Sequence, residues 1–126
     1  MRPFFLVALS LTALTSCTGP AAPDAELCKD VIERFCAQPR CGSATLTLNL
    51  PDTDCEATVE ARTGCASPDF TFPAPGFDNL TRSRVIDCRL PLVRDSTARF
   101  TAPRCEYADE TMRNCPDLVR FLGGTP

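Results

Sequence analysis

Two segments of the sequence repeat one pattern of cysteines and glutamates, C-E-x3-E-x4-C. The two copies contain the pairs Glu56/Glu60 and Glu106/Glu110. Residues four apart share one face of a helix, so each pair would place two carboxylates side by side. Such pairs can bind Ca²⁺ or act as the acid and base of a glycosidase-type hydrolase when they line a cleft. The interpretation we favour is a duplicated helix with solvent-exposed glutamates.

Composition excludes several other kinds of chemistry. The 126 residues include no histidine, which rules out Ser-His and Cys-His catalysis, histidine-ligated metals and histidine pH switches. Thirteen basic and 16 acidic side chains give a formal net charge of −3. This balance does not indicate a protein that binds nucleic acid.

The chain has nine cysteines. Apart from Cys17 they are Cys28, Cys36, Cys41, Cys55, Cys65, Cys88, Cys105 and Cys115. An even set of eight in an exported chain predicts four disulfide bonds. A thiolate metal site and a thioredoxin-like redox site are the alternatives, but no C-x-x-C pair occurs. We therefore expect no metal and no cofactor.

Geometry restricts how these cysteines can pair. If residues 24–37 form one helix, Cys28 and Cys36 lie about 12 Å apart, beyond the roughly 7 Å that a disulfide bridges. The same limit excludes a bridge within either repeated segment if that segment is helical. The remaining pairings stay open. At about 2–4 kcal/mol for each bridge, we expect the reduced protein to unfold.

The first 16 residues have the pattern of an export signal. Arg2 precedes an apolar run of about a dozen residues, shorter than the roughly 20 that cross a membrane as a helix. The following Leu14-Thr15-Ser16-Cys17 resembles a lipobox, the cleavage motif of bacterial lipoproteins. The resemblance implies cleavage before Cys17, a diacylglycerol on its sulfur and an acyl chain on its amino terminus. An ordinary signal peptide with a chance cysteine is the alternative.

Residues 17–23 read as the lipidated cysteine and a short tether of Pro, Ala and Gly. At about 3.1 Å per residue the tether keeps the domain within roughly 20 Å of the bilayer. In the lipoproteins that the lipobox resembles, Asp after the cysteine retains the protein in the inner membrane. Thr18 stands there instead, which favours the outer membrane. Residues 24–126 then form a single disulfide-stapled domain.

Three elements are predicted before the long loop. Asp24 begins a helix to residue 37, because Leu27, Val31, Ile32 and Phe35 recur at helical spacing. Residues 45–50 alternate strictly and predict a short strand, which Pro51 ends. Thr53-x-x-Glu56 resembles a capping box that opens a second helix, with Gly64 as its stop.

Residues 68–80 form a Pro/Gly-rich loop that carries Phe70, Phe72 and Phe77. Exposed rings would make a docking surface, whereas rings that turn inward would cover the core, which we favour. Residues 82–104 hold six arginines against two aspartates, a local charge of +4. Arg82 and Arg84 would extend the Phe surface toward lipid phosphates or an acidic partner. Ordinary surface charge is the more economical interpretation.

The last part of the chain leaves one assignment open. Residues 81–94 fit both an alternating strand and one helical face, and Pro91 weakens either. Asn114-Cys115-Pro116-Asp117 opens a short C-terminal docking helix, and the predicted buried stripe comprises Leu118, Val119, Phe121 and Leu122.

The cysteine spacing over residues 28–126 resembles that of small cysteine-rich bacterial lipoproteins. It is carried by Phe35-Cys36-x4-Cys41-Gly42, by C-x9-C at Cys55, and by Cys105-x9-Cys115-Pro-Asp-Leu before Gly-Gly-Thr-Pro. Members of that class look helical, which favours a helix over 81–94. We therefore predict a mainly α, small disulfide-rich helical domain with long loops; the alternative is an α+β domain with a short hairpin.

The resulting functional prediction is a membrane-anchored bacterial lipoprotein that acts as a non-enzymatic binding or structural module of the envelope. Its expected partners are the bilayer, through acyl chains on Cys17, and an envelope protein or glycan. A carboxylate-dependent hydrolase is the first alternative. An exported inhibitor or toxin-like protein is the second.

Overall fold

The computed structural model describes residues 23–37, 40–76, 79–96 and 100–123. Its helices are α1 (Pro23–Cys36), α2 (Gly42–Thr47), α3 (Cys55–Thr63), α4 (Arg82–Arg89), the 3₁₀ helix η1 (Leu90–Val93), α5 (Cys105–Asn114) and α6 (Pro116–Phe121). The described residues contain no strand. The mainly α prediction is confirmed, and the α+β alternative is wrong.

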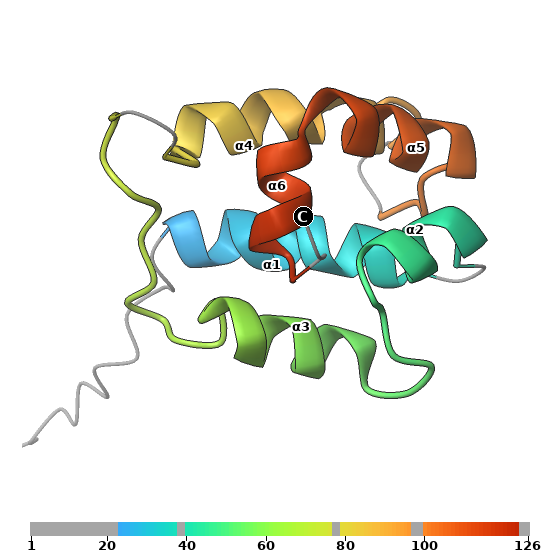
Figure 1. Ribbon diagram of the computed structural model, residues 1–126, viewed down its shortest axis with the longest axis horizontal. Coiled ribbons are helices and arrows are strands. Elements are labelled where there is room, and N and C mark those ends of the chain that lie inside the picture. Colours follow the sequence, from blue (N-terminus) through green and yellow to red (C-terminus); the bar gives the residue numbers. More distant parts are fainter. Residues whose placement is uncertain (1–22, 38–39, 77–78, 97–99, 124–126) are drawn as a thin grey trace, which may run out of the picture.

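Helix α1 lies at the centre of the molecule. Figure 1 shows α3 along one side of α1 and the layer of α4 and α5 along the other, with α6 crossing between them. The predicted apolar stripe of α1 is confirmed, since Val31, Ile32 and Phe35 are buried. The helix begins at Pro23, and Asp24 in its first turn suits the positive end of the helix dipole.

Four disulfides join these helices. They are Cys28–Cys65, Cys36–Cys55, Cys41–Cys105 and Cys88–Cys115, with Cα–Cα distances of 5.2–6.1 Å. The first two connect α1 to the two ends of α3, at Cys55 and just after the helix at Cys65, and so hold the two helices antiparallel. The third ties the start of α2 to the start of α5, and the fourth ties α4 to the junction of α5 and α6. As predicted, no bridge lies within α1 or within either repeated segment.

The predicted strand over 45–50 is wrong, because this part of the chain forms α2 and its C-terminal turn. Asn49 has a φ of 51°, in the left-handed region. The Leu50 N–H donates to Thr45 O at 2.9 Å and the Asn49 N–H to Leu46 O at 3.3 Å, the paired bonds of a Schellman motif. Helical spacing buries Leu48 and leaves Leu46 84% exposed. The alternation of leucines therefore reflects a helix and its cap.

The predicted capping box is wrong, because α3 starts at Cys55, one residue later than an N-cap at Thr53 would place it. Asp54 occupies the N-cap position with a φ of 52°, and no side chain caps the helix there. The stop at Gly64 is confirmed, since its φ of 84° is a left-handed conformation that glycine adopts without strain.

Within the ambiguous segment 81–94, residues 82–93 are helical, as the resemblance indicated. The Thr81 hydroxyl accepts a hydrogen bond from the Arg84 N–H at 3.3 Å and caps α4. Val85 and Cys88 turn into the core. Pro91 lies at the start of η1, where a helix does not need its missing N–H.

The predicted C-terminal helix is confirmed as α6. Pro116 is its first residue, and Cys115 separates it from α5. Leu118 and Leu122 are each 1% exposed, so α6 docks firmly on the core.

Candidate functional site

The start of α1 is where the proposed tether meets the domain. The Asp24 carboxylate accepts a hydrogen bond from the Phe72 backbone N–H at 2.9 Å, 48 residues along the chain. The Arg82 Nε lies 3.4 Å from the other oxygen of that carboxylate. One side chain thus holds the Pro/Gly-rich loop and the first turn of α4 against α1.

The aromatic rings of the loop turn toward the core, as we favoured. The Phe70 and Phe72 centroids lie 4.9 Å apart, edge to face, and Phe121 of α6 is 5.8 Å from Phe72. Phe72 is buried and Phe70 half-buried. The docking surface that we considered for these rings is therefore wrong for Phe72. Phe77 lies outside the described residues.

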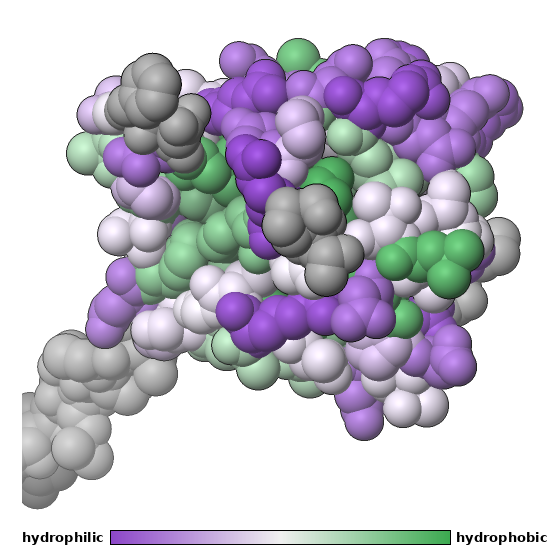
Figure 2. Space-filling model, viewed as in Figure 1, coloured by the Kyte–Doolittle hydropathy of each residue, from purple (hydrophilic) through white to green (hydrophobic). Residues whose placement is uncertain are grey.

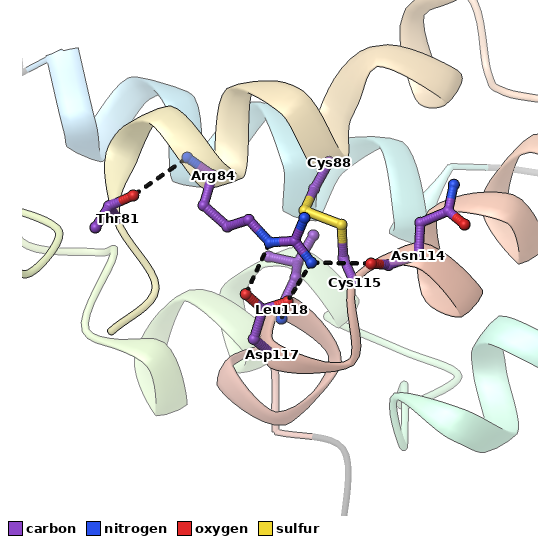
Figure 3. Close-up of polar contacts among 7 residues, drawn as sticks. All are labelled: Thr81, Arg84, Cys88, Asn114, Cys115, Asp117 and Leu118. Atoms are coloured by element: carbon purple, nitrogen blue, oxygen red, sulfur yellow. Dashed lines mark hydrogen bonds and ion pairs between the residues drawn. A yellow bond between two sulfur atoms is a disulfide. The ribbon is translucent and has the colours of Figure 1, made fainter. Parts of the chain in front are cut away.

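Arg84, the second arginine of that predicted surface, is hydrogen-bonded to other residues of the protein. Figure 3 shows its guanidinium between Asp117 and the Asn114 carbonyl, beside the Cys88–Cys115 disulfide. Its Nε and Nη2 donate to the two Asp117 oxygens at 2.9 and 3.2 Å. Burial alone would raise the pKa of Asp117, but hydrogen bonds from Arg84 and the Leu118 N–H lower it below its usual value.

A second ion-pair cluster is formed by two residues of α1, Asp30 and Arg34, and by Arg89 of α4. Arg34, only 7% exposed, donates from Nε and Nη2 to both oxygens of Asp30 at 3.0 and 3.2 Å. Arg89 of α4 also donates to Asp30. Burial would raise the pKa of Asp30, but the two guanidinium groups lower it overall. The cluster joins α1 to α4, with one carboxylate shared between two guanidinium groups.

The other described arginines of residues 82–104 are also paired. Arg94 donates to both oxygens of Glu110 at 2.9 and 3.0 Å, while Arg104 lies 3.6 Å from both Asp95 and Glu106. Arg99 lies outside the described residues. Each described arginine of this segment thus has a carboxylate nearby, from α1, α5 or α6 and, for Arg104, from Asp95 as well, an arrangement that fits ordinary surface charge.

The structure does not bring the repeated glutamate pairs together. Glu56 and Glu60 are on α3 and Glu106 and Glu110 on α5, which lie on opposite sides of α1 in Figure 1. Glu56 and Glu60 line an open depression of about 510 Å³ near Arg40. The hydrogen bond from Arg94 lowers the pKa of Glu110, which keeps that carboxylate ionised. The hydrolase hypothesis needs one pair of carboxylates in a cleft, and only Glu56 and Glu60 share a depression here, so that hypothesis stays an untested alternative.

A second open depression lies between α2 and α5. It measures about 330 Å³ and is lined by Thr47, Asp109, Met112 and Arg113. The neighbouring Leu46 is 84% exposed, more than any other large apolar side chain of the described chain. Figure 2 shows a strongly apolar patch over α2. Sequence reasoning missed this surface because it paired Leu46 with Leu48 on one face of a strand.

Among the described residues, one group of potential metal ligands lies close enough together to hold an ion. It consists of Cys88, Cys115 and Asp117. Both sulfurs belong to one disulfide, so neither is a thiolate that could ligate a metal. Within the described ranges, no helix is both long and apolar enough to cross a membrane.

Comparison with protein-family models, with curated protein sequences and with solved structures finds no significant match.

Proposed function

We propose that this chain is a lipid-anchored module of the bacterial cell envelope that binds an envelope component and has no catalytic activity of its own. The observation that carries the proposal is the set of four disulfides, which involve all eight cysteines after Cys17. Disulfides on this scale persist in oxidising compartments outside the cytosol. The ninth cysteine, Cys17, is the one that the lipobox resemblance assigns to acylation.

The anchor is proposed from Leu14-Thr15-Ser16-Cys17. Two or more acyl chains, at about 0.8 kcal/mol for each buried CH₂, hold a protein stably on a bilayer, whereas one chain does so only reversibly. Thr18 after the anchor favours the outer membrane, on its periplasmic face or at the cell surface.

The binding role is proposed from the placement of charged and apolar side chains. The described arginines of residues 82–104 and several carboxylates neutralise one another, so a partner is not attracted by a single strong charge. The α2–α5 depression instead offers Met112 next to Asp109 and Arg113, and the exposed Leu46 precedes Thr47 of its lining. Apolar contacts ringed by charged groups suit a protein surface.

The test is the intact mass of protein purified from membranes, with and without thiol alkylation. We expect the mass of the chain from residue 17 plus its acyl groups, no alkylated thiol and no bound metal. Cys17→Ser is the control. This variant should no longer be found in the membrane fraction, and its four disulfides should still be intact. An unacylated wild-type chain, two or more free thiols, or a stoichiometric metal would overturn the proposal.

A further inference from the structure

The position of the proposed anchor limits how the domain can sit on its membrane. Six residue steps separate Cys17 from Pro23, the first residue of α1. A fully extended chain covers at most about 3.6 Å per residue, so the start of α1 stays within roughly 20 Å of the anchored sulfur. The 14 residues of α1 span about the same distance, at 1.5 Å per residue. One end of α1 is thus held near the bilayer while the other is free to point away.

The surface around the held end is uncharged over a continuous stretch. Residues 70–76 are fixed there by the hydrogen bond from the Phe72 N–H to Asp24, and none of them is acidic or basic. Pro73, Ala74 and Pro75 are exposed. Figure 1 shows this segment at the same end of the molecule as the starts of α1 and α4. Arg82 lies beside it with a side chain 53% exposed.

The opposite end of α1 has a different character. The Cys36–Cys55 disulfide fixes the start of α3 against the last residue of α1. Three carboxylates are exposed there, those of Asp52, Asp54 and Glu56. The Asp52 side chain is 97% exposed and meets Arg40 only at 3.5 Å. An anionic membrane surface repels such a group and attracts a free cation.

We propose that residues 70–76 and Arg82, the tether-proximal end, rest on the bilayer that holds Cys17, so that the acidic start of α3 points away from it. This inference rests on the proposed function, because the anchor supplies the tether. The exposed and uncharged side chains of Pro73, Ala74 and Pro75 lose little on entering the headgroup region. The Arg82 guanidinium lies beside them, at the level where lipid phosphates occur. Asp24 at this end is already bonded to Arg82 and to the Phe72 N–H, and two exposed carboxylates, Glu26 and Asp69, flank the uncharged segment.

Single tryptophan probes test this orientation, because the chain contains no tryptophan. Ala74→Trp places a probe on the tether-proximal end, and Ala57→Trp places a matched probe on the exposed first turns of α3. Each full-length variant is purified in its acylated form and reconstituted in phosphatidylethanolamine/phosphatidylglycerol vesicles that contain brominated acyl chains. For a residue 5–10 Å inside the headgroup boundary, we expect about half of the Ala74→Trp emission to be quenched and the Ala57→Trp emission to be unchanged.

Equal quenching of the two probes, stronger quenching of Ala57→Trp, or no quenching of either would overturn the orientation. Flotation and intact mass of each sample come first and separate the two proposals. A chain that carries no acyl group and does not float refutes the anchor and the orientation together. A chain that is acylated and floats, but leaves Ala74→Trp unquenched, refutes the orientation alone. Circular dichroism checks folding, and Pro75→Trp replaces Ala74→Trp if that variant does not fold.

Discussion

The Arg84 guanidinium binds both carboxylate oxygens of Asp117, 33 residues away, at 2.9 and 3.2 Å. The same guanidinium donates to the Asn114 carbonyl at 2.9 Å. These bonds fasten α4 to the junction of α5 and α6, where the Cys88–Cys115 disulfide makes the covalent connection. Planar two-point contact is a geometry that arginine provides and lysine does not.

Breaking this pair should cost a modest amount of stability. Both side chains are partly exposed, so we expect Asp117→Asn to lower the free energy of unfolding by about 1 kcal/mol, toward the upper end for partly exposed pairs. Urea denaturation of Arg84→Met, Asp117→Asn and the double variant should show a favourable coupling energy. Asp69→Asn, at an exposed position in the loop after α3, is the control and should be neutral. Strict additivity of the two single changes would contradict the assignment.

The Asp30 cluster should make the domain less stable in acid. The pKa of Asp30 and that of Asp117 are lower in the folded protein than in the unfolded chain. Their contribution is therefore complete above the unfolded pKa and is lost as the pH falls through the folded pKa. We expect the free energy of unfolding, measured with urea, to decrease between about pH 5 and pH 2.

Asp30→Asn isolates the contribution of the Asp30 cluster to this effect. At neutral pH it leaves the buried Arg34 without a counter-ion, which should cost about 3 kcal/mol. The variant should also lose much of the acid dependence, since the titrating group is gone. Glu33→Gln, one turn along the exposed side of α1, is the matched control. An unchanged dependence on pH in Asp30→Asn would show that other carboxylates cause the acid sensitivity.

Two leucines of α2 and its cap distinguish the helix from the strand that the alternation suggested. Leu48 has no exposed surface and Leu46 is 84% exposed. Leu48→Ala should cost about 2–5 kcal/mol, as for other buried leucines. Leu46→Ala should stay within about 0.5 kcal/mol. A strand with one buried face would make both changes costly, so similar losses in thermal melts of the two variants would contradict α2.

The Cys41–Cys105 disulfide should be the first to open under mild reduction. Cys105 is exposed, whereas both cysteines of the Cys28–Cys65 and Cys88–Cys115 bridges are buried. Limited phosphine treatment followed by alkylation and peptide mapping identifies the first thiols. The bridge spans 64 residues, so replacing both cysteines with serine should cost about 4 kcal/mol in the loop-entropy model. Earlier labelling of Cys88 and Cys115 would contradict this order.

Local patterns were sufficient for much of the fold. The stripe of Val31, Ile32 and Phe35 predicts α1 because helical periodicity is a property of neighbouring residues. Gly64 and Pro116 mark a helix end and a helix start for the same reason, since each restricts its own backbone. The number of disulfides follows from the cysteine count, and helix length excludes the wrong local pairs.

Features that depend on contacts between distant residues could not be read in this way. The alternation over 45–50 by itself fits a strand. The Schellman turn at Asn49, and the finding that Leu48 is buried whereas Leu46 is exposed, show that it is a helix and its cap. The arginines of residues 82–104 form a basic patch in the sequence, yet their carboxylate partners come largely from α1, α5 and α6.

The sequence by itself determined the kind of protein: short helices, eight cysteines for four bridges, no histidine chemistry and a candidate anchor at Cys17. These properties depend on residue types and on spacings of a few positions. Only the tertiary structure decided which cysteines pair, which charges neutralise each other and which rings are buried. Each of those outcomes requires contact between side chains that are distant in the sequence, such as Asp24 and Arg82, which are 58 residues apart. A pattern of neighbouring residues does not specify such a distance.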